Sequence, residues 1–170
     1  MGDNRNESLA QIYDLLAPRY ADGDGINDFY TLPIVKHFCL PSARCALEVC
    51  CGVGRIAVEL TKNVQSVWGI DLSPEMIAIA RQRSQSVPNK PVFIQGDLSA
   101  YDFGDQSFDY IYGAYFTAYF EIGALIRKLI TLTRTGGRIV FIDGLQGPGI
   151  GSFRLMDIAR QYIDYTRFMR

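Results

Sequence analysis

Apolar runs that end abruptly at glycine or an acidic residue alternate with helical patterns along most of this chain. The runs occupy residues 46–49, 67–70, 92–95, 108–112 and 138–142, and apolar positions at helical spacing fill residues 74–86 and 122–132. Such alternation predicts an α/β fold, a doubly wound and mainly parallel sheet with helices on both faces.

The first apolar run leads into a turn that contains two glycines, Gly52 and Gly54, and then into helical periodicity. Glycine has no Cβ, so the chain can adopt positive φ there and a ligand can lie against backbone N–H groups at the helix N-terminus. This strand, turn and helix are typical of a site that binds a nucleotide-like cofactor.

The second run ends at Asp71, 19 residues after Gly52. In a βαβ unit this spacing places a carboxylate at the carboxyl end of the neighbouring strand, where it can accept hydrogen bonds from ribose hydroxyls. The alternative is that Asp71 caps the next helix. Ser73 is better placed as the cap, because Pro74 follows it at the first helical position.

The composition fits one cofactor-binding domain. The 170 residues carry a formal net charge of −1, which gives no electrostatic signal for nucleic acid binding, and no apolar run is long enough to span a bilayer. The polar N-terminus lacks the apolar segment of a signal peptide, so we expect a cytoplasmic protein. The four cysteines lack metal-binding spacing, and we expect no metal.

Five short motifs follow one another in a characteristic order. They are EVCCGVG at residues 48–54, GIDLSPEM at 69–76, GDL at 96–98, SFD at 107–109 and TGGR at 135–138. Over roughly residues 10–150 the sequence resembles the class I S-adenosylmethionine-dependent methyltransferases. The resemblance implies a three-layer Rossmann-like sheet of order 3-2-1-4-5, S-adenosyl-L-methionine as cofactor and methyl transfer as the reaction.

The same resemblance extends to the N-terminus and suggests two parts. Residues 13–20, YDLLAPRY, are similar to the lid helix that precedes the core in the small-molecule branch of the family. We therefore expect lid helices over residues 1–44 and an S-adenosylmethionine-binding core over residues 45–170.

Roles for individual residues follow from the resemblance. Main-chain groups around Cys50, Gly52 and Gly54 would hold the methionyl part of the cofactor, and Glu48 would support this loop unless it only bonds nearby backbone. Asp71 would bind the ribose and Asp97 the adenine amino group. The complete expected set of cofactor-binding residues is Tyr20, Glu48, Cys50, Gly52, Gly54, Asp71, Leu72, Met76, Asp97, Leu98, Tyr112 and Tyr115.

The loop after the fourth run is rich in aromatic residues. We expect Tyr112 and Tyr115 to face the cofactor sulfonium, where aromatic faces attract a cation, and Phe116 and Phe120 to cover the sheet edge. The acceptor is expected to be a small, partly apolar molecule. His37, the only histidine, lies in an apolar helical stretch and is interpreted as structural. No catalytic base is assigned.

Two other functions fit parts of the pattern. A dinucleotide-dependent oxidoreductase would also use residues 52–57, which satisfy G-x-G-x-x-A, with Asp71 downstream. The later motifs count against it. A catalytically silent relative that binds cofactor or a partner protein is the second alternative.

Two departures from the family pattern leave a catalytically silent relative as an alternative. Cys50 replaces the first glycine of the family's turn. Residues 152–169 carry apolar positions that we interpret as a helix after the fifth strand, so the family's antiparallel hairpin is expected to be missing. The fifth strand would then be an exposed edge, which suggests a truncated chain or a homo-oligomer formed through that strand.

Overall fold

The computed structural model describes residues 3–22, 26–145 and 152–159. Two helices, α1 (Asp3–Asp22) and α2 (Ile26–Phe38), precede the sheet. The chain then continues in the order β1 (Cys45–Val49), α3 (Arg55–Leu60), β2 (Ser66–Asp71), α4 (Pro74–Arg83), β3 (Val92–Gln95), β4 (Phe108–Ala114), a short 3₁₀ turn η1 (Thr117–Tyr119), α5 (Ile122–Leu132), β5 (Thr133–Leu145) and β6 (Ser152–Ala159).

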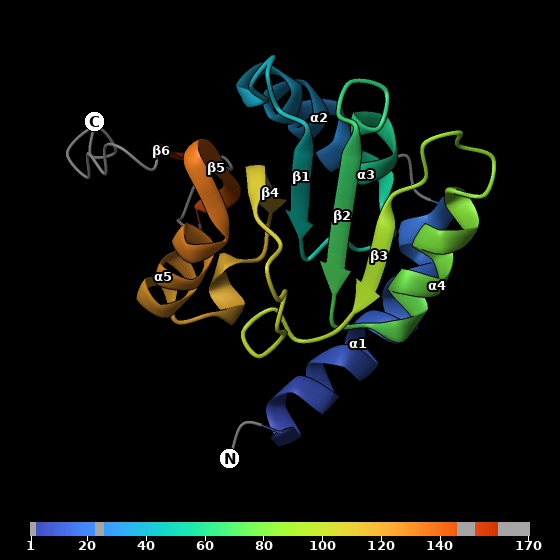
Figure 1. Cartoon of the computed structure of the whole chain (residues 1–170). Helices are drawn as coiled ribbons and strands as arrows, with labels where there is room; N and C mark the ends of the chain where they lie inside the picture. Colours follow the sequence, from blue (N-terminus) through green and yellow to red (C-terminus); the bar gives the residue numbers. More distant parts are fainter. Residues whose placement is uncertain (1–2, 23–25, 146–151, 160–170) are drawn as a thin grey trace.

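The described strands form one sheet of order β3-β2-β1-β4-β5-β6. The first five strands in this order are parallel, so the predicted order 3-2-1-4-5 and the predicted doubly wound α/β fold are confirmed. The carboxyl ends of β1, β2, β3 and β4 therefore meet at one edge of the sheet. Figure 1 shows α1 running beneath this edge, close to the tips of β2 and β3.

Two apolar cores hold the layers together. One packs residues of α2, α3 and α4 against the sheet, with Ile56, Ile77 and Val140 among its buried members. The other packs α5 against the opposite face, with Leu125 and Leu129 fully or nearly fully buried. Because both faces are covered, the inner strands β1 and β4 are mostly apolar, as is typical of a buried parallel sheet.

The prediction for residues 152–169 is wrong over the part that the structure describes. Residues 152–159 form a strand that pairs antiparallel with β5, from Arg138↔Ala159 to Leu145↔Ser152. The physical reason is that β5 would otherwise leave a row of unpaired backbone groups, and a neighbouring strand satisfies them along its length. Residues 160–169 of the predicted helix lie outside the described residues.

This strand also removes the basis for two other expectations. One strand of the family's antiparallel hairpin is present, so the hairpin is not wholly missing. The edge of β5 is covered by β6 rather than exposed, so the argument for a homo-oligomer through β5 no longer holds.

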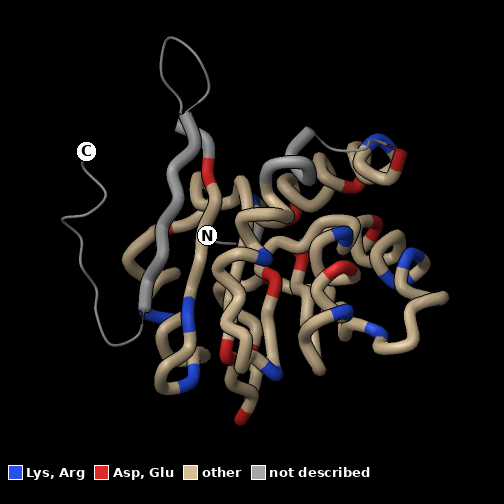
Figure 2. Tube along the Cα trace, turned by 90° about the horizontal axis from the view of Figure 1, so that it is seen from above, with Lys and Arg blue, Asp and Glu red and all other residues tan. Residues whose placement is uncertain are grey.

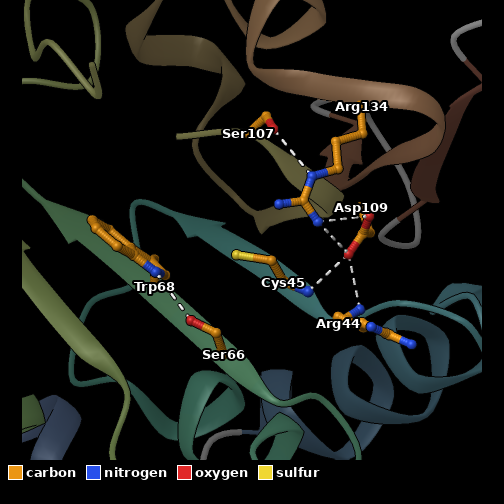
Figure 3. A network of polar contacts seen from close by, with 7 residues as sticks. All are labelled: Arg44, Cys45, Ser66, Trp68, Ser107, Asp109 and Arg134. Atoms are coloured by element: carbon orange, nitrogen blue, oxygen red, sulfur yellow. Dashed lines mark hydrogen bonds and ion pairs between the residues drawn. The ribbon is translucent and has the colours of Figure 1, made fainter. Parts of the chain in front are cut away.

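A carboxylate joins three segments at the amino end of the sheet (Figure 3). Asp109 Oδ2 accepts hydrogen bonds from the backbone N–H of Arg44 at 2.8 Å and of Cys45 at 2.9 Å, and the Arg134 guanidinium donates to both oxygens at 3.1 Å. Partial burial pushes the pKa of Asp109 upward, but these hydrogen bonds outweigh it and hold the pKa below its ordinary value. Asp109 is a structural residue, far along β4 from the carboxyl edge.

Charged residues of both signs are interspersed along the described chain (Figure 2), in keeping with its small net charge. None of the helices in the described ranges is long and apolar enough to cross a membrane. Nor do three or more histidine, cysteine or acidic residues gather there as metal ligands would.

Candidate cofactor and acceptor site

The loop after β1 has the backbone conformation that the glycines predict. Cys50, Gly52 and Gly54 have φ values of 52°, 50° and 70°. The two glycines serve different purposes. A Cβ on Gly54 would lie 2.5 Å from the Phe93 ring, so this glycine permits close packing, whereas a Cβ on Gly52 would meet only the Met76 sulfur at 3.9 Å. The Gly52 position is therefore open on the side where a ligand would lie.

Asp71 closes this loop from the end of β2. Its Oδ2 accepts from the Gly52 N–H at 2.8 Å, and its Oδ1 accepts from the Ser73 N–H at 3.0 Å. Burial raises the pKa of Asp71, and these hydrogen bonds only partly oppose the rise. The cap of α4 is Ser73, whose hydroxyl accepts from the Met76 N–H at 3.1 Å. The Asp71 carboxylate is thus not occupied in capping that helix.

A cavity extends from this loop to the loop after β4 and lies between α1 and the carboxyl edge of the sheet. Its lining comes from the N-terminal helix, the ends of β1 to β4 and the aromatic loop. The lining residues are Asn6, Leu9, Tyr13, Tyr20, Cys50, Gly52, Asp71, Leu72, Met76, Asp97, Ser99, Ala114, Tyr115, Phe116, Tyr119 and Phe120.

Most of the residues that were expected to bind the cofactor line this cavity. They are Tyr20, Cys50, Gly52, Asp71, Leu72, Met76, Asp97 and Tyr115. Cys50 is half-buried in the loop, and desolvation together with the nearby charges of Asp71, Asp97 and Glu48 raises the pKa of its thiol. The Cys50 side chain is therefore a neutral thiol at neutral pH.

Four residues of the expected cofactor-binding set do not line the cavity: Glu48, Gly54, Leu98 and Tyr112. Glu48 is buried below the loop, where its Oε2 accepts from the Ala57 N–H at 2.9 Å and from the Tyr112 hydroxyl at 3.3 Å. Tyr112 is fully buried and stacks on Tyr110, with ring centroids 5.4 Å apart. Leu98 belongs to the core on the α5 side. In these positions Glu48 supports α3 from beneath, and Tyr112 lies inside the core rather than at the cavity wall.

Asp97 lies at the far end of the cavity, after β3. Its Oδ1 accepts from the Ser99 N–H at 2.8 Å, and its Oδ2 accepts from the side-chain amide of Asn6 at 2.9 Å. An NH₂ group of α1 is therefore already bound at the carboxylate that the family resemblance assigns to the adenine amino group.

Further polar contacts hold α1 against the core. Asp14 accepts from the Ser73 hydroxyl and from the Glu75 N–H, and the Arg55 guanidinium donates to the backbone carbonyls of Tyr20 and Ala21. The helix spans the cavity from Asp97 at one end to the start of α3 at the other. Sequence reasoning named this helix as a lid but missed Asn6, Leu9 and Tyr13 as lining residues.

The loop after β4 forms the remaining wall. Tyr115 has a φ of 58°, and its N–H donates to the Ile142 carbonyl at 2.8 Å. Asp143, at the end of β5, accepts from the N–H and the hydroxyl of Thr117 and so fixes the start of η1. Phe116 is buried against Phe141, as expected of a covering residue, and it also lines the cavity.

Lining residues in this loop were missed for a simple reason. Tyr119 and Phe120 belong to no motif, and neither does Ala114, the last residue of β4, or Ser99 in the loop after β3. His37, in contrast, lies on α2 with its ring against Phe38 and is not among the lining residues.

Comparison with known proteins settles the family. A family model described as a methyltransferase domain matches residues 46–137, more than half of the chain. The chain belongs to this family. The matched region runs from β1 to the start of β5, so it includes the loop after β1, Asp71 and Asp97. The predicted membership of the class I S-adenosylmethionine-dependent methyltransferases is confirmed.

Two curated methyltransferases illustrate the relationship. The chain is 31% identical over 141 residues to the 2-phytyl-1,4-naphtoquinone methyltransferase of Thermosynechococcus vestitus, covering 81% of this chain and 61% of that protein. It is 26% identical over 180 residues to the demethylmenaquinone methyltransferase of Staphylococcus aureus, covering 99% of this chain and 72% of that protein. The chain thus spans only part of the length of these methyltransferases.

A solved methyltransferase has the same fold. Magnesium protoporphyrin IX methyltransferase from Synechocystis PCC 6803, with bound SAH, superimposes with a TM-score of 0.66 at 21% identity, covering 80% of this chain and 70% of that one. At this identity the likeness concerns the fold.

Proposed function

We propose that this chain transfers a methyl group from S-adenosylmethionine to a small, flat, partly apolar acceptor. One observation carries the proposal: within the matched family region, a single cavity joins the open backbone at Gly52 with the carboxylates of Asp71 and Asp97. These groups suit, in this order, the methionyl part, the ribose and the adenine of the cofactor.

The residues present fit the cofactor. The Asn6 amide on Asp97 is the same kind of donor as the adenine amino group, so this carboxylate can accept such a group in the folded protein. Gly52 leaves its backbone open to the cavity. Leu72 and Met76 would pack on the adenine, while Asp71 would accept from the ribose hydroxyls.

The bound cofactor would supply an electrophilic methyl group whose leaving sulfide needs no protonation. The residues of this chain would align the acceptor with that methyl group, and alignment alone can lower a barrier by about 7–11 kcal/mol. Tyr115 lies on the wall next to the β1 loop, where an aromatic face favours a cation. A base is needed only for an acceptor that must lose a proton, and no residue is assigned to this role.

The names of two relatives and the aromatic residues that line the cavity both support a flat, aromatic acceptor. The curated relatives at 31% and 26% identity are named for a naphthoquinone and for demethylmenaquinone. In this chain Tyr115, Phe116, Tyr119 and Phe120 line one side of the cavity, and aromatic side chains of this kind pack well on a flat ring system. A fused-ring acceptor of the quinone or hydroquinone type fits both observations.

The N-terminal helices would act as the lid, as expected for residues 1–44. The polar contacts that hold α1 on the core are hydrogen bonds, which break and re-form readily, so the helix would open to admit ligands. Residues from 45 onward would form the cofactor-binding core.

Thermal unfolding with added ligand tests the proposal. S-adenosylhomocysteine at 100 times its dissociation constant would stabilise the protein by about 2.7 kcal/mol and raise its melting temperature, whereas NAD would leave it unchanged. A shift with NAD alone would overturn the proposal in favour of an oxidoreductase. Binding of S-adenosylhomocysteine without methyl transfer to any naphthohydroquinone would favour the silent relative instead.

A further inference from the structure

Two tyrosines from opposite walls of the cavity bond to each other. Tyr13 lies on α1 and Tyr119 on η1, and their phenol oxygens are 2.6 Å apart. The rings meet edge to face, with centroids 6.0 Å apart. In the part of the chain that the structure describes, neither hydroxyl has another hydrogen-bond partner. The pair therefore bridges the lid and the loop after β4.

The pair has hydrogen-bonding capacity to spare. Two phenols offer two protons and several lone pairs, and their mutual hydrogen bond uses one proton and one lone pair. One donor and further acceptors remain at the wall of a cavity with several aromatic lining residues. A ligand that fills the cavity without bonding to these groups would leave them desolvated, which is costly. The pair thus favours a ligand that carries an oxygen.

Tyr119 places the pair beside the proposed acceptor. It belongs to η1, in the loop that follows β4 and carries the aromatic lining residues that the proposed function assigns to the acceptor. Tyr13 reaches Tyr119 from α1 and packs beside Met76 and Val53, next to the loop after β1. The two phenol oxygens are therefore within reach of an acceptor that packs on this loop.

We propose that Tyr13 and Tyr119 together hold an oxygen on the ring of the methyl acceptor, which is therefore a hydroxylated aromatic molecule such as a naphthol or hydroquinone. This inference rests on the proposed function, because it assigns the acceptor end of the same cavity. It adds the acceptor's hydrogen-bonding group and the residues that select it.

The protonation state of the Tyr13 phenol determines whether the pair acts as a hydrogen-bond donor or as a base. Burial raises the pKa of Tyr13, and the hydrogen bond to Tyr119 raises it further. Tyr13 is therefore a neutral donor at neutral pH and not a base. The pair positions the acceptor oxygen, and removal of a proton from the acceptor is left to other groups or to solvent.

Calorimetric titration with two probes tests the pair directly. Protein saturated with S-adenosylhomocysteine is titrated with 1-naphthol and with naphthalene, which differ by one hydroxyl group. We expect the wild type to bind 1-naphthol about tenfold more tightly, the effect of one hydrogen bond. Tyr13→Phe and Tyr119→Phe each reduce this preference, and the double variant abolishes it. Tyr101→Phe, outside the cavity lining, is the matched control and keeps it.

Three results would overturn the inference: equal binding of both probes by the wild type, a preference that survives in the double variant, or a loss of S-adenosylhomocysteine affinity as large as the loss of 1-naphthol affinity. The last result would assign the pair to the cofactor. If S-adenosylhomocysteine does not bind at all, the proposed function fails, and the same two probes titrated into the unloaded protein still decide whether the pair recognises a ring hydroxyl.

Discussion

Asp71 and Asp109 are carboxylates at opposite ends of the sheet, and both accept hydrogen bonds from two backbone N–H groups. They differ in what else surrounds them. Asp109 pairs with Arg134, and its pKa is held low. Asp71 has no basic partner among the described residues, and burial raises its pKa.

Under the proposed function, this difference separates a structural carboxylate, Asp109, from one that would bind a ligand, Asp71. Arg134 compensates the charge of Asp109 within the folded protein, and the contacts of Asp109 join β4 to the start of β1 and to the start of β5. The charge of Asp71 is left to be compensated by weak donors, and ribose hydroxyls are donors of this kind. The four predictions below test or sharpen the contrast, from the largest expected effect to the smallest.

Asp71→Ala should weaken S-adenosylhomocysteine binding by between about ten- and a hundredfold, because each hydrogen bond to a charged group contributes roughly 1.5–3 kcal/mol. The variant should also lose some stability, since the N–H groups of Gly52 and Ser73 lose their acceptor. Calorimetry measures the affinity, with Asp105→Ala on an exposed loop as the control. Unchanged affinity in a folded Asp71→Ala protein would make Asp71 only a loop residue.

Asp109→Ala should affect the stability of the protein and not its affinity for the cofactor. It should lower the free energy of unfolding by about 1–3 kcal/mol, because two backbone donors and Arg134 lose their partner. Its affinity for S-adenosylhomocysteine should stay at the wild-type value. Urea unfolding and calorimetry measure the two quantities. A stable variant with weakened cofactor binding would break the contrast.

The pH dependence of this stability has a definite sign. The folded-state pKa of Asp109 lies below its ordinary value, so its contribution is present above the unfolded pKa and is lost as pH falls through the folded pKa. The stability gap between wild type and Asp109→Ala should therefore narrow below about pH 4, near the ordinary pKa of aspartate. Asp71 titrates at higher pH because its pKa is raised.

Asn6→Ala should tighten S-adenosylhomocysteine binding by about two- to fivefold, because the Asn6 amide occupies the Asp97 oxygen that the adenine amino group would use, and one such hydrogen bond contributes about 0.5–1.5 kcal/mol. Asn4→Ala, exposed on the same helix, is the control. Weaker binding by the Asn6 variant would show that Asn6 assists the cofactor rather than competing with it.

Much of the carboxyl edge could be predicted from the sequence because local signals define it. Gly52 is needed for a positive φ, and Asp71 ends an apolar run at a spacing set by one βαβ unit. Asp97 follows the next strand in the same way. Each of these positions is fixed by residues close to it in the chain.

The remaining features depend on contacts between distant segments. Asn6 and Tyr13 enter the cavity only because α1 crosses the sheet edge, and Tyr119 meets Tyr13 across 106 positions. Glu48 and Tyr112 lie opposite each other in neighbouring strands, and this register buries both. β6 forms because β5 offers an unpaired edge, and the pattern of residues 152–159 alone did not reveal this.

The central claim is that the cavity at the carboxyl edge holds the cofactor, and a crystal structure with S-adenosylhomocysteine tests it most directly. We expect the ribose hydroxyls on the Asp71 carboxylate, the adenine amino group on Asp97 and the Asn6 amide displaced from it. The ligand should leave the contacts of Asp109 with Arg134 unchanged. Ligand bound outside this cavity, or within it with no contact to Asp71 or Asp97, would contradict the account.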